Sequence, residues 1–373
     1  MKPFIPVFRP RLPDAERLLP YLRRIDASRI YANWGPLTTE LEQRLARTFG
    51  LSQPAVVSAS SGTAALVGAM LASGGRATSA RPLAAVPAFT FVATAIAVEQ
   101  CGYRPYLLDV DPHDWSLDLE KLERHPLLHQ IGLVVVVAPF GRPANQAACR
   151  CFRERTGIPV VIDGGGSFEA VCRNPGETLG AVPTALSFHA TKSFAMGEGG
   201  CVVTTDEPLA SDVARALNFG FESSRNSVAA SINGKLSEYH AAVGLAELDQ
   251  WTGTHNAFLA VAQQYRRAFA ASLPNHRLIV APEVASCYAL LEAENADVAT
   301  QIRRHLEESN VDTRLWYGEG LQRHDCYRDL PRDSVDVTQS LAPRLIGLPM
   351  ACDLTADAIE RIVATIGEVA ADE

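Results

Sequence analysis

The sequence predicts an α/β fold: a mostly parallel sheet of about seven strands with helices on both faces, followed by a small α+β domain. Two observations support this prediction. Over the first two thirds of the chain, short β-branched, apolar runs alternate with segments long enough for a helix. These runs are apolar throughout, as expected for strands that helices cover on both faces.

The expected strands are residues 55–59, 83–87, 105–109, 133–138, 159–163, 185–190 and 200–205. The apolar segments 62–72 and 90–102 between them are expected to be helices. The stretch "MGEGG" before the last strand is too short for a crossover helix. We therefore expect strand 200–205 to run antiparallel to the strand before it.

The length of 373 residues suffices for one large core and a smaller domain. From about residue 207 the pattern becomes helical and later mixes helical segments with short apolar runs. We expect a large domain over residues 1–254, including an N-terminal arm, and a small α+β domain over 255–373. A long helix is expected to join them.

The composition is that of a soluble globular enzyme, with 47% hydrophobic and 20% charged residues. The net charge of −8 and the lack of a basic stripe argue against a nucleic-acid partner. No apolar run approaches the length of a membrane span, and the N-terminus lacks the apolar core of a secretion signal. The eight cysteines are scattered and suit reduced thiols better than a zinc site, so a cytoplasmic location is expected.

A single lysine stands out in "SFHATKSFAMGEGG" (187–200). The chain contains 34 Lys and Arg residues, yet its only lysines are Lys2, Lys121, Lys192 and Lys235. An amine can lose its proton and attack a carbonyl, which a guanidinium cannot do. Small and apolar neighbours would desolvate the Lys192 amine and lower its pKa, as a Schiff-base lysine requires.

Two more polar signals follow expected strands, and ligands of open α/β sheets bind beyond the carboxyl ends of strands. In "SASSGTAAL", Ser61, Gly62 and Thr63 lead into a helix, whose free amides and dipole favour a phosphate. Asp163 closes "PVVID" and precedes three glycines, and Ser187 lies near the end of the next strand. Such a carboxylate needs a cation or a donor nearby, since its desolvation is costly.

Each signal has an ordinary structural explanation. The Ser-Gly-Thr stretch and Asp163 could each cap a helix, and Lys192 could extend to solvent or cap a C-terminus. Together, however, a phosphate cradle, a carboxylate and an activated lysine are what pyridoxal 5′-phosphate (PLP) requires. The phosphate anchors the cofactor, the carboxylate keeps the ring nitrogen protonated, and the lysine binds the aldehyde and moves protons.

These residues closely resemble the DegT-type family of PLP-dependent aminotransferases, which act on nucleotide-linked sugars and have the fold-type I architecture. The resemblance spans nearly the whole chain. It rests on an ordered set of segments: 33–50, 60–71, 86–98, 106–112, 159–170, 187–204, 232–249 and 345–350.

Position by position, the resemblance implies a role for each matching residue. Lys192 matches the internal-aldimine lysine and Asp163 the partner of the ring nitrogen. The cofactor-binding residues are then Ser61, Gly62, Thr63, Phe91, Asp163, Ser187, Lys192 and Asn233. Phe91 matches the ring-stacking aromatic, with Phe89 as an alternative, and either could be a core residue.

Asn233 matches an asparagine that reaches the cofactor phosphate of the other subunit, which implies a homodimer with shared sites. Its alternative is a turn residue, because Asn-Gly is a turn signal.

The sequence departs from the family in two places. Where many members carry Gln or His three residues after the aspartate, this chain has Gly166, which leaves space or water beside the ring and receives no role. The stretch 317–327 lacks the Pro-Leu-His-like segment of many relatives. Substrate contacts are therefore open, with Trp34, Trp316, Tyr317 and His324 as candidates.

The resemblance implies an aminotransferase that takes its amino group from glutamate, leaving pyridoxamine phosphate. It then passes the group to a nucleotide-diphosphate keto-sugar in a ping-pong cycle. Relatives with histidine in place of the lysine deoxygenate or dehydrate instead, so Lys192 favours amino transfer.

A keto-inositol or other cyclic polyol ketone is an alternative acceptor. A non-catalytic binding protein on a PLP scaffold is a further alternative. A dinucleotide-binding oxidoreductase is disfavoured, since no G-x-G-x-x-G follows the first strand.

Overall fold

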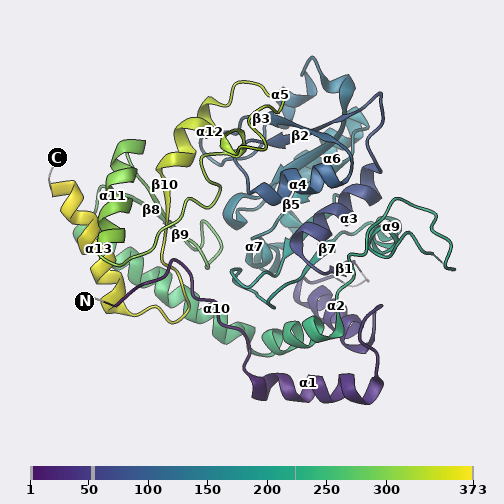
Figure 1. Ribbon diagram of the computed structural model, residues 1–373, viewed down its shortest axis with the longest axis horizontal. Helices are drawn as coiled ribbons and strands as arrows, with labels where there is room; N and C mark the ends of the chain where they lie inside the picture. Colours follow the sequence, from purple (N-terminus) through teal and green to yellow (C-terminus); the bar gives the residue numbers. More distant parts are fainter. Residues whose placement is uncertain (1–2, 52–54, 223, 372–373) are drawn as a thin grey trace.

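Two β-sheets and the helices around them make up the protein in a computed structural model that describes residues 3–51, 55–222 and 224–371 (Figure 1). The seven-stranded sheet has the order β1-β7-β6-β5-β4-β2-β3, and the three-stranded sheet the order β10-β9-β8. The strands of the large sheet are β1 (Val56–Ala59), β2 (Leu83–Pro87), β3 (Arg104–Leu108), β4 (Ile131–Val137), β5 (Val160–Asp163), β6 (Thr184–Ser187) and β7 (Gly200–Val203).

The predicted large sheet is confirmed, including its one reversed strand. Strands β3, β2, β4, β5 and β6 pair in parallel, whereas β7 pairs antiparallel with both β6 and β1. Strand β1 therefore runs in the same direction as β5 and β6. The carboxyl ends of these three strands, at Ala59, Asp163 and Ser187, consequently lie along one edge of the sheet.

The predicted strand ends differ from the observed ones by up to three residues. Strand β6 ends at Ser187 instead of residue 190, because the chain then makes a turn in which Lys192 N–H donates to His189 O at 2.9 Å. This turn carries Lys192 away from the sheet.

Nine α-helices are found among the described residues before the long helix α10. They are α1 (Ala15–Ser28), α2 (Pro36–Thr48), α3 (Gly62–Gly74), α4 (Val92–Gln100), α5 (Leu119–Glu123), α6 (Gln146–Thr156), α7 (Phe168–Arg173), α8 (Pro175–Thr178) and α9 (Glu207–Leu217). Helices α3, α4 and α9 pack on one face of the sheet, against residues such as Val86, Val135 and Val161. Helices α5 and α6 cover the alternate residues on the other face, among them Val134 and Val160. The apolar runs are thus covered on both sides, as predicted.

A 35-residue helix, α10 (Glu238–Ser272), runs from the large sheet to the second sheet (Figure 1). That sheet contains β8 (Arg277–Val280), β9 (Ala289–Glu292) and β10 (Leu345–Leu348), all antiparallel. Its helices are α11 (Ala296–Glu308), α12 (Asp336–Leu341) and α13 (Ala356–Ala371). The domain boundary expected at residues 254/255 falls inside α10 and stays a prediction.

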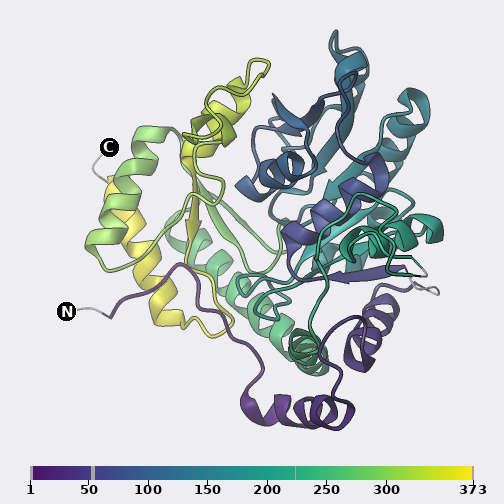
Figure 2. The same cartoon turned by 45° about the vertical axis from the view of Figure 1, so that its right-hand side comes forward.

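The N-terminal arm lies beside the second sheet and α13 (Figure 2). Ile5 pairs with Val311 and Phe8 with Met350 in isolated β-bridges, and Ile5 belongs to the apolar core of the second sheet. The arm then crosses to α1 below the large sheet. The part of the chain around the large sheet and the part around the second sheet are therefore connected by this arm as well as by α10.

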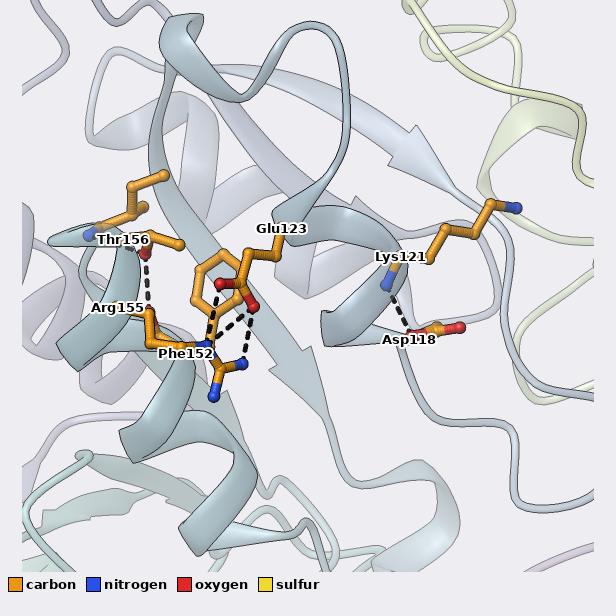
Figure 3. A network of polar contacts seen from close by, with 7 residues as sticks. Asp118, Lys121, Glu123, Phe152, Arg155 and Thr156 are labelled. Atoms are coloured by element: carbon orange, nitrogen blue, oxygen red, sulfur yellow. Dashed lines mark hydrogen bonds and ion pairs between the residues drawn. The ribbon is translucent and has the colours of Figure 1, made fainter.

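The surface of the large domain carries ordinary helix-stabilising contacts (Figure 3). Arg155 on α6 binds both carboxylate oxygens of Glu123 on α5, with Nε at 2.9 Å from each and Nη2 at 2.7 Å from Oε2. Asp118 caps α5 by accepting from Lys121 N–H at 2.9 Å, while the Lys121 side chain extends away from these pairs. Lys121 is thus an exposed lysine, unlike Lys192.

Neither a membrane-crossing helix nor a metal-binding cluster is found in the described part of the chain. No helix there is both long and apolar enough to cross a bilayer. No group of three or more His, Cys, Asp or Glu residues within it gathers in a way that could hold a metal ion. All eight cysteines are free.

Glu238 at the start of α10 anchors the beginning of α2. Its carboxylate is fully buried and accepts from Leu37 N–H at 2.8 Å, Thr38 N–H at 2.9 Å and Thr38 Oγ1 at 2.5 Å. The N-cap residue of α2 is Gly35, which has no side chain to do this. Glu238 thereby satisfies amides that α2 leaves free at its N-terminus.

We expect Glu238→Ala to destabilise the cofactor-free protein by about 3 kcal/mol, because it leaves buried donors without an acceptor. Denaturant unfolding measures this loss. Glu40→Ala serves as the control, since it breaks only the partly exposed pair with Arg24 and should cost less than about 1 kcal/mol. Equal losses in the two variants would contradict the anchoring role of Glu238.

Candidate active site

The carboxyl ends of β1, β5 and β6 border a cavity of about 400 Å³. Its wall includes Ser61, Gly62, Thr63, Phe91, Asp163, Ser187 and Lys192, which the sequence predicts as cofactor-binding residues. The second sheet and its loops add Tyr288, Arg314, Trp316 and Tyr317, and the N-terminal arm adds Phe8. The structure therefore brings together seven of the eight predicted cofactor-binding residues.

Asp163 is a half-buried carboxylate in this wall. Its Oδ2 accepts from Thr94 Oγ1 at 2.6 Å and its Oδ1 from Gly165 N–H at 3.1 Å. Burial raises the pKa of Asp163 above its ordinary value, while these two hydrogen bonds and the charge of Lys192 oppose the shift. A further cation in the cavity would stabilise the charged carboxylate.

Lys192 is held by Tyr288, a residue that directly precedes strand β9 of the second sheet. Its Nζ donates to Tyr288 Oη at 2.9 Å and lies 5.7 Å from the centre of the Tyr288 ring. Tyr288 is buried, and burial raises the pKa of its hydroxyl well above the ordinary value. The Tyr288 hydroxyl is therefore neutral at physiological pH and accepts from the amine without forming an ion pair.

The start of α3 forms an anion cradle. Ser61 caps the helix, its Oγ accepting from Ala64 N–H at 3.0 Å. The amides of Gly62 and Thr63 donate to no acceptor in the described part of the chain. Such amides at a helix N-terminus favour a phosphate.

Two glycines let the ends of β1 and β6 come together at this cradle. A Cβ at Gly62 would lie 2.6 Å from Ser187 Cβ, and a Cβ at Gly200 would lie 2.8 Å from Ser61 O. Both distances are shorter than real Cβ contacts, so a side chain at residue 62 would push against Ser187 and one at residue 200 would push against the backbone of Ser61.

Phe91 and Phe89, the alternatives for the ring-stacking role, lie in different places. Phe91 is the N-cap residue of α4, lines the cavity and is 54% exposed. Phe89 is buried in an aromatic cluster, 5.1 Å from the ring centre of Tyr317 and 5.7 Å from that of Trp115. Phe91 is thus the one available to a ligand.

Gly166 lines the cavity, and the expected space beside a bound ring stays a prediction. A Cβ at residue 166 would lie 3.1 Å from Gly141 N and 3.5 Å from the carbonyl carbon of Phe140. The backbone of a short 3-10 helix, η2 (Pro139–Gly141), therefore fits closely against Gly166. Glycine at this position allows that close approach.

Three predicted site residues do not line the cavity of this chain. Asn233 accepts from Lys235 Nζ at 2.7 Å, and Trp34 Nε1 donates to Glu42 Oε1 at 2.9 Å. His324 packs near Tyr327, with their ring centres 6.4 Å apart. Of the four candidates for substrate contacts, Trp316 and Tyr317 alone lie in the cavity wall.

The sequence did not point to Thr94, Tyr288 or Arg314. Thr94 has a recognisable signal, since it is a polar residue one turn after Phe91 and the other residues of 92–98 are apolar. Arg314 lies two residues before Trp316, and its Cζ is 5.3 Å from the ring centre of Phe8 and 5.9 Å from that of Trp316. Tyr288 is separated from Lys192 by 96 residues and has no local signal.

The family model for the DegT/DnrJ/EryC1/StrS aminotransferases matches residues 14–367, nearly the whole chain. This chain belongs to that family. It is therefore a PLP-dependent aminotransferase with the fold-type I architecture, as predicted.

Curated relatives are similar over almost their full length. A Mycobacterium tuberculosis protein is 30% identical over 98% of this chain and 90% of its own. The dTDP-4-amino-4,6-dideoxy-D-glucose transaminase of Shigella dysenteriae is 26% identical over 98% of this chain and 99% of its own.

Solved structures of DegT aminotransferases and similar proteins share the fold. DesI, solved in the presence of its TDP-sugar product, has a TM-score of 0.86 and 28% identity, covering 99% of this chain and 93% of its own. A Bacillus cereus protein described as a PLP-dependent aminotransferase has a TM-score of 0.88 and 26% identity, covering 98% and 100%.

The cavity of this DegT aminotransferase suits PLP in each of its polar parts. The carboxylate of Asp163 is desolvated and would gain from a cationic ring nitrogen. The free amides at the start of α3 and the adjacent Ser187 hydroxyl suit a phosphate. The amine of Lys192 lines the same cavity and suits an aldehyde.

We expect Asp163→Asn to leave the cofactor-free protein as stable as the wild type, or more stable, at pH 8. An unfolded Asp has a pKa near 3.9, and burial raises that of folded Asp163. The folded state then binds its proton more tightly, so stability falls as pH rises through this window. Asn removes that cost and can still bond Gly165 and Thr94. Activity should fall about 10²–10³-fold, as when a charge-stabilising group is lost.

Thermal melts of the cofactor-free protein between pH 4 and pH 8 measure this effect. Asp118→Asn is the control, because Asp118 is an exposed helix cap for which Asn is an equivalent residue. An Asp163→Asn variant that melts well below the wild type at pH 8, or that keeps full activity, would contradict the assignment.

Proposed function

We propose that this protein transfers an amino group from glutamate to a keto-sugar carried on a nucleotide diphosphate, with PLP held between Asp163 and Lys192. One observation carries this proposal: a single cavity contains the Lys192 amine, the desolvated Asp163 carboxylate and the N-terminus of α3. These three groups match the aldehyde, the ring nitrogen and the phosphate of one molecule.

Each side chain then has a task in a ping-pong cycle. When bound, PLP supplies an electron sink and carries the amino group between the two substrates. The Lys192 amine would hold the cofactor at its aldehyde and, when free, would move the proton at the substrate carbon. Asp163 would stabilise a protonated ring nitrogen, and Phe91 offers an aromatic surface for a ring. Ser61, Gly62, Thr63 and Ser187 would hold the phosphate.

The nucleotide-sugar assignment is supported by the relatives and by the mouth of the cavity. The Shigella relative is named as a transaminase of a dTDP-linked sugar, and DesI was solved with a TDP-sugar. At the mouth, Arg314 is exposed and lies against Phe8 and Trp316, without a carboxylate partner in the described part of the chain. A guanidinium that lies against two aromatic rings suits the phosphates of the acceptor or a carboxylate of the donor.

A homodimer with shared sites follows from the same proposal. Phe91 is exposed although it lines the cavity, and Phe219 and Val228 are exposed on the segment that leads to Asn233. Asn218 and Asn233 form a β-bridge in this segment, so its fold presents Asn233 together with Phe219. Exposed apolar residues near an incomplete site favour contact with a second copy of the chain.

The absorbance spectrum of the protein loaded with PLP tests the role of Lys192. The wild type should show a cofactor absorbance band that glutamate removes and that a nucleotide keto-sugar restores. Lys192→Ala should lack this band and lose activity, whereas Lys121→Ala, which changes an exposed lysine, should behave as the wild type. A band that survives unchanged in Lys192→Ala would refute the assignment.

Arg314→Gln should raise the KM for the anionic substrate about 10- to 100-fold while leaving kcat close to the wild type, since it removes a charge-assisted contact that is made before the reaction. Steady-state kinetics with each substrate varied in turn identifies which one Arg314 binds. Arg150→Gln, which breaks an exposed helix pair with Glu154, is the matched control. An unchanged KM for both substrates would exclude Arg314 from binding either.

A further inference from the structure

A four-residue turn, Ala285–Tyr288, extends from the second sheet to the cavity. Tyr288 N–H donates to Ala285 O at 3.0 Å, which closes the turn directly before β9. The last residue of the turn is the one that contacts Lys192. Whatever holds the turn therefore also sets the position of the Tyr288 hydroxyl.

Two anchors from the large domain hold this turn. Ala285 N–H donates to Phe140 O at 2.8 Å, next to Gly166. Glu169 on α7 accepts from Ser286 twice: its Oε1 lies 2.6 Å from Ser286 Oγ and 3.1 Å from Ser286 N. Its second oxygen, Oε2, lies 3.2 Å from the same amide. Both anchors join segments more than one hundred residues apart in sequence.

Glu169 is an unusual residue to find in this place. Its side chain is only 3% exposed, and it does not line the cavity. The imidazole of His255 lies beside it, with Nδ1 3.6 Å from Oε2 and its ring stacked on Trp251. Burying a carboxylate is costly unless its hydrogen bonds compensate, and here the turn supplies the strong ones.

The far end of the turn is equally confined. The Tyr288 ring meets Phe140 edge-on at 5.3 Å between ring centres and Trp316 edge-on at 5.4 Å. With the ring packed and the backbone anchored, the Tyr288 hydroxyl has one position, 2.9 Å from Lys192 Nζ. A shift of the turn would move this hydroxyl away from the amine.

We propose that Glu169 is a positioning residue that acts through Ser286 and Tyr288 to aim the amine of Lys192. This inference rests on the proposed function in one respect, that Lys192 is the reactive amine. Glu169 links the large sheet to the turn and the turn to the lysine. The reactive amine thus depends on a carboxylate that touches neither substrate nor cofactor.

The first test is the reactivity of Cys287, which lies inside the turn and is 6% exposed. In the cofactor-free protein, Glu169→Gln and Ser286→Ala should raise the labelling rate of Cys287 by a thiol reagent about tenfold, equivalent to about 1.4 kcal/mol. Peptide mass spectrometry measures the rate at each cysteine. Buried Cys149 is the internal control. The matched variant is Glu247→Gln, which changes a buried carboxylate on a different helix, α10.

The second test is the pH midpoint of the Lys192-dependent absorbance band in the loaded protein. Tyr288→Phe should shift this midpoint by about one unit, a tenfold change in the proton equilibrium. Glu169→Gln should shift it in the same direction. The double variant should shift it no further than Tyr288→Phe alone, because Glu169 acts through that hydroxyl. A merely structural role would give additive shifts.

Each outcome decides a separate point. Wild-type values of both the labelling rate and the midpoint in Glu169→Gln, or equal effects in Glu247→Gln, would overturn the proposal. If Glu169→Gln fails to fold, Ser286→Ala tests the same contact from its other side, since it keeps the carboxylate. A wild-type protein without a Lys192-dependent band would refute the proposed function, and Cys287 labelling would still show whether Glu169 holds the turn.

Discussion

A carboxylate that is partly removed from water, yet left without a full cationic partner, is the constraint on which the rest of this site depends. Asp163 ends β5 in the cavity wall, where burial raises its pKa and two hydrogen bonds only partly offset that cost. A protein gains nothing in stability from such an arrangement. A ligand that brings a positive charge next to Asp163 binds more tightly, because it offsets the desolvation cost of this carboxylate.

The fold places the other groups around this carboxylate by simple means. Strands β1, β5 and β6 run in the same direction, so their ends and the helix that follows β1 meet at one edge. Glycines at 62 and 200 let these ends approach closely. The second sheet then closes the cavity with Tyr288, Trp316 and Arg314, and the N-terminal arm contributes Phe8. The site is thus built from several parts of the chain that pack as one body.

Local patterns in the sequence are enough to predict the large sheet, its reversed strand and most of the cavity wall. Each of these features depends on residues close in sequence, such as the apolar runs, the Ser-Gly-Thr stretch before a helix and Asp163 at the end of a strand. Contacts between distant segments cannot be predicted in this way. Tyr288 reaches Lys192 across 96 residues, and Glu169 reaches Ser286 across 117, without a periodic or compositional signal.

Some residues that the sequence predicts for the site do not line the cavity, and their contacts explain why. Asn233 and Trp34 are candidates because of a resemblance that places one of them at the site of a second subunit. Within one chain, both side chains form local hydrogen bonds. The close approach of η2 to Gly166 has no signal in the sequence, because it depends on where η2 packs. Such packing is decided by the whole fold.

In the protein loaded with PLP, we expect the Asp163 carboxylate to pair with a protonated ring nitrogen. The most direct measurement compares the dissociation constants of PLP and of an analogue with carbon in place of that nitrogen, for wild-type protein and for Asp163→Asn. We expect the wild type to prefer PLP by at least about tenfold, or about 1.4 kcal/mol, and Asp163→Asn to bring this ratio close to one. An equal ratio in the two proteins would contradict this pairing.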